Sequence, residues 1–248
     1  MRDAVRAAFY DFNRPMEGDI PWFYQDVKGL VSIGVGILCD PIQLALNLPM
    51  VWPGGDPAGR SAIASEWLRI KNLPPDDKGR TAAQLGHLYA KPFTKLRLTE
   101  EGLRLTVESK MNVNEQVLRR AFFGWDTWPA DAQMATLSMS WAVGPAFWSP
   151  QAGRNYWPKL TAALKGCDFR TAAVECFLSE EKTISGLRPR NKANRLLFEN
   201  AAIVEEKRLD PGALYYPREL ARLGPDDETP AEGFRLHELD SDPPPEAA

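Results

Sequence analysis

The chain has few of the residues that build metal centres and disulfide frameworks. Its 248 residues include three cysteines and two histidines. Cys39, Cys167 and Cys176 form no Cys-x-x-Cys pair, and an odd number favours reduced core residues. His87 and His237 lie far apart, which leaves too few ligands for a His-based zinc site. We therefore expect no metal and no cofactor. The missing zinc and Cys–His sets also disfavour an amidase or a peptidase.

Long apolar runs are also missing. No stretch approaches the ~20 apolar residues that a membrane-spanning helix needs. The N-terminal sequence MRDAVRAAFYDFNRP has no apolar core of signal-peptide length. We therefore expect no membrane span and a protein made in the cytoplasm without a signal peptide. If it acts elsewhere, another system must carry it there.

The chain does contain enough apolar residues for a large folded body. Hydrophobic residues make up 44% of it, with 8 Trp and 11 Phe, which is ordinary for a globular protein. The composition changes after residue 222, because residues 223–248 hold eight acidic residues, one arginine and several prolines. The sequence predicts one folded domain over 1–222 and a disordered acidic, proline-rich tail over 223–248. The body before this tail is mildly basic, which suits a polyanionic partner.

Helical periodicity recurs along most of the chain. The predicted helices cover 2–12, 61–72, 99–122, 130–143, 155–164, 168–177 and 189–207. Thr99 is a suitable N-cap for the third helix. The fourth is apolar or small nearly all round and is predicted to be the buried central helix. Between them, 41–95 forms an irregular region or insertion, in which His87 is expected at the surface.

The period changes between Trp22 and Leu38, where β-type residues predominate. Lys28-Gly29 is a turn candidate. Gly34 and Gly36 leave one strand face bare, so another group can approach the backbone closely. The sequence predicts a short sheet of two or three strands here. The fold class is therefore α+β and predominantly helical, with a small N-terminal β-sheet lobe and a larger helical lobe.

Three polar side chains stand out between Met16 and Asp40. Asp26 follows Glu17 by nine positions, and Ser32 follows Asp26 by six. Cleavage of a glycosidic bond needs an acid that protonates the leaving oxygen and a carboxylate that activates water. Apolar and aromatic neighbours favour the protonated form of Glu17, which suits a general acid. Asp26, in a more solvated place, suits the base, and Ser32 would hold the attacking water with it.

The motifs EG, YxDxxG and SIGVGxL, which run from Glu17 to Leu38, resemble the catalytic signature of phage-type lysozymes. These are the muramidases of tailed-phage endolysins and their bacterial relatives. In that family a Glu, an Asp and a Thr form a triad at this spacing, and Ser32 takes the place of the Thr here. The resemblance implies a lysozyme-like catalytic domain over 1–222. It also implies an inverting mechanism, for which the carboxyl groups must lie about 6.5–9.5 Å apart.

Two later stretches extend the resemblance. Residues 131–144 are similar to the central buried helix of the family, and residues 189–198 to its Arg-bearing helix. The resemblance implies substrate contacts by Leu38, Trp141 and Arg190. Trp141 suits the core equally well, and Arg190 suits a structural ion pair. The chain also departs from the family, because Ile37 stands where many members have His and Ala142 where some have an amide.

The resemblance implies a muramidase that cuts between N-acetylmuramic acid and N-acetylglucosamine, with bacterial peptidoglycan as its partner and no nucleic acid. A phage endolysin would reach the wall through a holin. A toxic effector would need a secretion apparatus, and its producer an immunity protein. The alternatives are a lytic transglycosylase or chitinase-like relative and an inactive wall-binding module. Asp26 and Ser32 argue against a transglycosylase, which needs no water-activating base.

Overall fold

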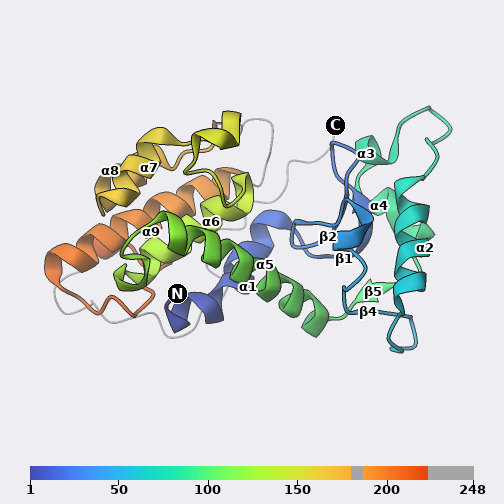
Figure 1. The fold of residues 1–248 in the computed structure, drawn as a ribbon, viewed down its shortest axis with the longest axis horizontal. Helices are drawn as coiled ribbons and strands as arrows, with labels where there is room; N and C mark the ends of the chain where they lie inside the picture. Colours follow the sequence, from blue (N-terminus) through green and yellow to red (C-terminus); the bar gives the residue numbers. More distant parts are fainter. Residues whose placement is uncertain (180–186, 223–248) are drawn as a thin grey trace. The chain divides into compact units, whose positions relative to one another are not determined.

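The computed structural model describes residues 1–179 and 187–222 (Figure 1). The tail predicted for 223–248 lies outside the described residues. The described chain is mostly helical and has two small antiparallel sheets, which confirms the α+β class. None of its helices is long and apolar enough to cross a membrane. Within the single domain expected for 1–222, the chain divides into two compact units. Unit 1 comprises Met1–Phe12 and the chain from Leu118 onward, and unit 2 comprises Asn13–Val117.

Unit 2 holds both sheets. The first has the strand order β1-β2-β3, as expected from the hairpin-like segment, and both of its pairings are antiparallel. Its strands are β1 (Ile20–Gln25), β2 (Val31–Gly34) and β3 (Ile37–Leu38). The second sheet pairs β4 (Met50–Val51) with β5 (Arg97–Leu98). These two-residue strands carry too short a pattern to be predicted from the sequence.

Helix α1 (Asp3–Glu17) is longer than the predicted 2–12 and continues through Pro15. Proline removes one backbone hydrogen bond from a helix. At this position the cost is confined to the last turn. The helix ends at Gly18, whose N–H donates to the carbonyl oxygen of Arg14 at 3.0 Å. Gly18 has a φ of 80°, which a glycine adopts readily. The extension makes Glu17 the last residue of α1.

The region 41–95 contains more regular structure than the sequence indicated. It holds η1 (Ile42–Leu44), α2 (Arg60–Lys71), α3 (Ala82–Leu85), α4 (His87–Ala90) and η2 (Lys91–Phe93). Helix α2 begins at Arg60, directly after Gly59, one residue before the predicted start at 61. The amide of Gln25 donates to the last carbonyls of α2, those of Ile70 and Lys71, at 2.8 and 3.1 Å. These bonds fix α2 to β1.

Helix α5 (Glu100–Ala121) matches the prediction closely. The hydroxyl of Thr99 accepts a hydrogen bond from the N–H of Gly102 at 3.0 Å, so Thr99 caps the helix as expected. Apolar residues spaced four to seven positions apart are buried along the helix and the residue after it; they are Leu103, Val107, Met111, Leu118 and Phe122. The residues of α5 up to Val117 belong to unit 2 and those from Leu118 to unit 1.

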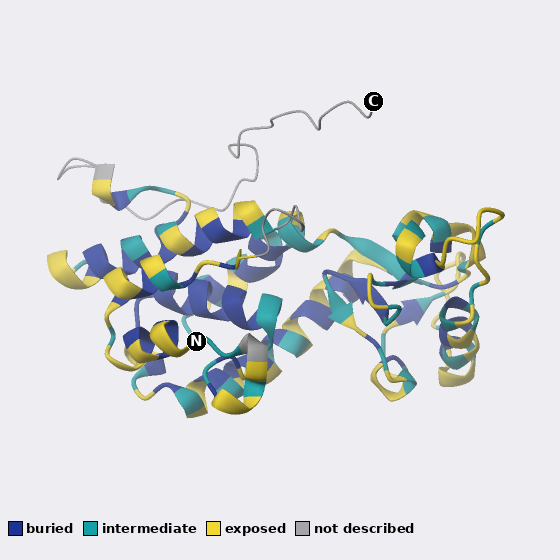
Figure 2. Cartoon of the chain, turned by 90° about the horizontal axis from the view of Figure 1, so that it is seen from above, coloured by how far each residue is buried: buried dark blue, intermediate teal, exposed yellow. Residues whose placement is uncertain are grey.

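Unit 1 is built around α6 (Ala130–Val143), which is buried over nearly its whole length (Figure 2). The other helices are α7 (Pro158–Lys165), α8 (Phe169–Glu175) and α9 (Leu187–Lys207), and short 3₁₀ segments are η3 (Trp125–Thr127), η4 (Pro150–Asn155) and η6 (Leu220–Arg222). Asp168 caps α8 as predicted and accepts from the N–H of Thr171 at 3.0 Å. The prediction for α7 began three residues too early. The helix begins at a proline, which is favoured at the first helical position.

A fully buried carboxylate holds the C-terminal part of unit 1 to α6. Asp131 accepts hydrogen bonds from the N–H groups of Tyr215 and Tyr216 at 2.9 and 3.0 Å, and from the amide of Asn200 at 3.2 Å. Burial raises the pKa of Asp131 to about 6, although these three hydrogen bonds oppose the shift. Asp131 therefore serves as a packing anchor inside unit 1.

Candidate active site

Glu17 lies against the backbone of Gly36, within unit 2. A Cβ atom built on Gly36 would lie 2.4 Å from Oε2 of Glu17 and 3.1 Å from its Cδ. Gly36 also has a φ of 65°, which side-chain-bearing residues rarely adopt. Only glycine leaves room for the carboxyl group at this place. The glycine that the sequence singled out as a point of close approach thus borders the candidate acid.

Ser32 lies in a row that crosses the three-stranded sheet. It pairs with Tyr24 on β1 and with Leu38 on β3. Directly opposite residues of antiparallel strands present their side chains on the same face. The phenol, the hydroxyl and the leucine therefore share one face of the sheet. Ser32 is buried and Leu38 is exposed.

Asp26 follows β1 directly and anchors the turn to β2. Its Oδ1 atom accepts hydrogen bonds from the N–H groups of Lys28 and Leu30 at 2.8 and 2.9 Å. The N–H of Gly29 donates to the carbonyl oxygen of Asp26 at 2.9 Å, and Gly29 has a φ of 73°. The predicted Lys28-Gly29 turn is therefore confirmed. Both N–H groups donate to Oδ1. Oδ2 is therefore the oxygen that would accept a proton from water in a catalytic role.

Tyr24 interacts electrostatically with both Glu17 and Asp26. It was not among the site residues expected from the sequence. Burial and, to a smaller extent, the negative charges of Glu17 and Asp26 together raise the pKa of Tyr24 to about 12. Its phenol thus remains a protonated hydrogen-bond donor within the field of both carboxylates. The motif YxDxxG could have indicated this, because Tyr24 precedes Asp26 by two positions and side chains two positions apart in an extended segment point to the same side.

A lysine from α5 reaches the same backbone. The ammonium group of Lys110 donates to the carbonyl oxygen of Gly36 at 3.1 Å. Burial raises the pKa of Cys39 to about 12, against the opposing positive charge of Lys110. Cys39 is therefore held as a thiol, which excludes it as a nucleophile. No local sequence pattern pointed to this contact, because it joins residues 74 positions apart in the chain.

His87, expected at the surface, is half-buried beside β1. Its carbonyl oxygen accepts a hydrogen bond from the indole N–H of Trp22 at 3.1 Å. Its ring centroid lies 6.3 Å from that of Trp22 and 6.2 Å from that of Tyr24. Lys91 and Arg97 also contact the Trp22 ring, at 5.0 and 5.2 Å from its centroid. The region 41–95 thus contributes side chains next to the candidate site.

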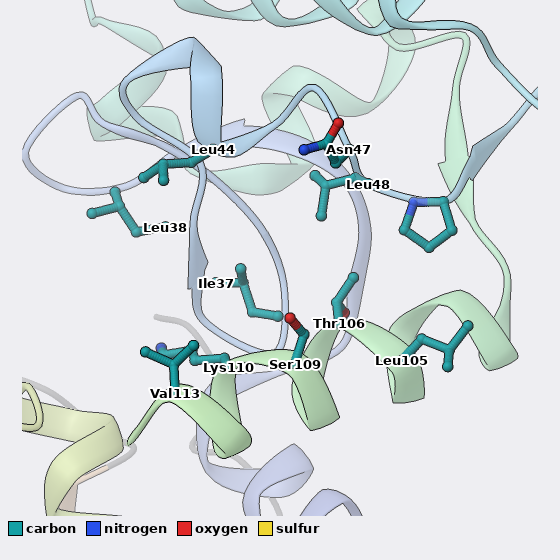
Figure 3. A pocket seen from close by; sticks show the side chains of 11 residues that line it. Ile37, Leu38, Leu44, Asn47, Leu48, Leu105, Thr106, Ser109, Lys110 and Val113 are labelled. Atoms are coloured by element: carbon teal, nitrogen blue, oxygen red, sulfur yellow. The ribbon is translucent and has the colours of Figure 1, made fainter. Parts of the chain in front are cut away.

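A cavity of about 580 Å³ begins one residue beyond Gly36 (Figure 3). The loop that follows β3 forms one wall and α5 forms the other. The apolar side chains that line it are Ile37, Leu38, Leu44, Leu48, Pro49, Leu105 and Val113. Lys110 is the cation among the lining residues. Leu38, expected to contact substrate, therefore belongs both to the Ser32 row and to this cavity.

The other two expected substrate contacts belong to unit 1. Trp141 is buried and packs against Phe9, with ring centroids 5.2 Å apart. Arg190 is only 1% exposed, and its guanidinium donates to the carbonyl oxygen and hydroxyl of Ser138 at 3.2 and 2.9 Å. Both side chains thus take part in the interior packing of unit 1.

Comparisons with known proteins assign no family. No protein-family model matches the sequence, and a search of curated proteins gives no significant match. Within residues 1–179 and 187–222, no group of three or more His, Cys, Asp or Glu side chains could hold a metal ion. What the site can do chemically therefore depends on the side chains of Glu17, Tyr24, Asp26 and Ser32.

Proposed function

We propose that this protein is a peptidoglycan hydrolase with a lysozyme-like fold. It would cleave the bond between N-acetylmuramic acid and N-acetylglucosamine by general acid–base catalysis. The observation that carries the proposal is the placement of Glu17, at the end of α1, against Gly36, in the turn between β2 and β3. Ser32 lies on β2 of the same sheet, and Asp26 follows β1 directly. Inverting glycoside hydrolysis needs a pair of carboxyl groups, one as acid and one as base.

Glu17 acts as the acid in this proposal. In its protonated form it gives its proton to the glycosidic oxygen as the bond from that oxygen to the sugar carbon breaks. The close packing against Gly36 limits where the carboxyl group can lie. A fixed acid supports catalysis, because misplacement of a catalytic group by about 1 Å can cost 100-fold in rate.

Asp26 acts as the base. It removes a proton from water as the water oxygen bonds to the sugar carbon, so one water molecule is consumed for each bond cut. The N–H groups of Lys28 and Leu30 donate to its Oδ1 and hold the carboxyl group in place at the turn. Ser32, buried on the same face as Tyr24, supplies a hydroxyl that can orient the water.

Peptidoglycan lies outside the cytoplasmic membrane, so the proposal includes a route to it. Release through a holin suits an endolysin. Injection by a secretion apparatus suits an antibacterial effector, with an immunity protein in the producer. Both routes deliver the same activity to the wall.

The test is digestion of purified peptidoglycan, followed by mass analysis of the products. Wild-type protein should release fragments with reducing muramic acid ends. Glu17→Gln should lower the rate by about 10²–10⁴-fold, the usual contribution of a general acid. Glu101→Gln, which removes an exposed glutamate of the same unit, is the matched control and should leave the rate unchanged.

Two results would contradict the proposal. Substantial turnover by purified Glu17→Gln would remove Glu17 from the mechanism. Anhydro-muramic ends would show a transglycosylase, in which no water is activated by Asp26. Folding of each variant is checked by circular dichroism, so that a loss of activity is not a loss of structure.

A further inference from the structure

One stretch of unit 2 carries positive charge with no acidic residue inside it. Residues 78–99 contain five lysines and arginines and one histidine, and no aspartate or glutamate. They include α3, α4, η2 and β5, all of which pack against β1. A surface whose charges are of one sign attracts partners of the opposite sign. This stretch therefore suits an anionic partner.

Two cations of this stretch lie over one aromatic ring. Nζ of Lys91, from η2, is 5.0 Å from the centroid of the Trp22 ring, and Cζ of Arg97, from β5, is 5.2 Å from it. The indole N–H of Trp22 donates to the carbonyl oxygen of His87 at 3.1 Å, which fixes the ring against α4. Like charges that are held close to each other repel, and a bound anion relieves this repulsion.

Carboxylates of the protein leave these cations unneutralised. Among the residues that the structure describes, none forms an ion pair with Lys91, Lys95 or Arg97, which we call the basic patch. Glu66 is only 2% exposed, pairs with Arg69, and accepts a hydrogen bond from the backbone N–H of Lys95. Lys91 and Lys95 are exposed and Arg97 is half-buried. The positive charge of the basic patch is therefore available to an anion from outside the chain.

Exposed apolar side chains accompany the basic patch. Leu88 is 66% exposed and Phe93 is 37% exposed. Helix α4 continues directly into η2, so Leu88 and Lys91, which are three positions apart, lie on the same side of this segment. Lysine and arginine next to exposed leucine and phenylalanine are typical of segments that lie at the surface of an anionic membrane. A soluble polyanion would need the cations only.

We propose that the basic patch, with Leu88 and Phe93, docks on a lipid bilayer that carries anionic headgroups. The ammonium and guanidinium groups meet the lipid phosphates, and the two apolar side chains enter the boundary between headgroups and acyl chains. Each basic residue near such a surface raises the affinity about fivefold, so the three together raise it roughly 100-fold. This docking does not depend on the proposed function, because none of the proposed catalytic groups takes part in it.

The experiment measures the sedimentation of the full-length protein with lipid vesicles. Vesicles of phosphatidylcholine alone are compared with vesicles that also contain phosphatidylglycerol. We expect binding to the anionic vesicles only, and its loss in about 1 M salt, which screens exposed charges. Lys91→Gln combined with Lys95→Gln should weaken binding about 25-fold. Lys165→Gln combined with Lys192→Gln is the matched control, because it removes two exposed lysines of unit 1 and should leave binding unchanged.

A third variant, Leu88→Ser, separates a membrane from a soluble polyanion. It should weaken vesicle binding about fivefold through the lost apolar burial, and it should leave the binding of polyphosphate unchanged. Equal binding of the wild type to both kinds of vesicle would overturn the inference. Equal weakening by the two lysine pairs would also overturn it, because net charge alone would then explain binding. If Leu88→Ser binds vesicles as the wild type does, the patch serves a soluble polyanion and the inference is wrong.

Discussion

Replacing Gly36 by alanine should reduce activity through a displacement of Glu17. The added Cβ atom would lie 2.4 Å from Oε2 of Glu17, whereas such atoms essentially never approach closer than 3.0 Å. The carboxyl group must therefore retreat by about 0.6 Å or more. Since a displacement of about 1 Å can cost 100-fold, we expect kcat to fall by about 10- to 100-fold.

The same substitution also strains the backbone, and this effect needs its own control. Gly36 has a φ of 65°, at which a Cβ atom costs roughly 1–2 kcal/mol. Gly79 has a φ of 74°, and a Cβ atom there would meet nothing within 4 Å. Gly79→Ala therefore carries the conformational cost without the clash. Both variants should lose similar stability in urea denaturation, and only Gly36→Ala should lose activity.

The assay is release of reducing ends from peptidoglycan at a temperature where both variants are folded. If Gly36→Ala retains half or more of the wild-type kcat, displacement of Glu17 does not control the rate. If Gly79→Ala is equally impaired, backbone strain alone explains the loss of activity, and the role of the clash with Glu17 is refuted. Partial recovery of Gly36→Ala by Glu17→Asp, whose side chain is shorter, would add support.

Two further predictions concern Tyr24 and Asp131. Tyr24→Phe keeps the ring beside His87 and removes a hydroxyl that lies in the electrostatic field of Glu17 and Asp26. We expect kcat to fall by about tenfold, the size of effect usual for loss of one hydrogen-bond donor, and the pH–rate profile to shift. An unchanged kcat and profile would exclude Tyr24 from the site. Asp131 has a folded-state pKa raised to about 6 from 3.8, so the folded state binds more protons between these values and stability increases as pH falls from about 6 to 4. The gain should approach about 3 kcal/mol in urea denaturation and should vanish in Asp131→Asn. Equal pH dependence of the wild type and Asp131→Asn would contradict the assignment.

The sequence predicted what local pattern encodes. Residue spacing located the sheet around Ser32, the turn at Lys28-Gly29 and the buried stripe of α5, because each depends on neighbours a few positions away. The sequence predicted that the first helix ends at residue 12, before Pro15, whereas α1 continues to Glu17. The helix tolerates the proline because only one hydrogen bond is lost and it belongs to the last turn. The spacing also assigned Glu17, Asp26 and Ser32 to one catalytic site, and that assignment stays a prediction.

Long-range contacts of the site were not predictable in this way. Lys110 reaches Gly36 across 74 positions of the chain, and His87 reaches Tyr24 across 63. Each lies on a helix face that looks solvated in isolation. Similarly, the family resemblance implied a substrate contact for Arg190, and a structural ion pair was the alternative. Its burial against Ser138 depends on the packing of α9 on α6.

The short helices of the region 41–95 have a consequence for solubility. Strand β1 is an outer strand of its sheet, and α3, α4, η2 and β5 all pack against it. An uncovered outer strand offers unpaired backbone groups to other chains and promotes aggregation. Trimming this region to obtain a more compact protein would uncover β1 together with the Trp22 ring. We therefore expect a trimmed variant to self-associate more readily than the full chain.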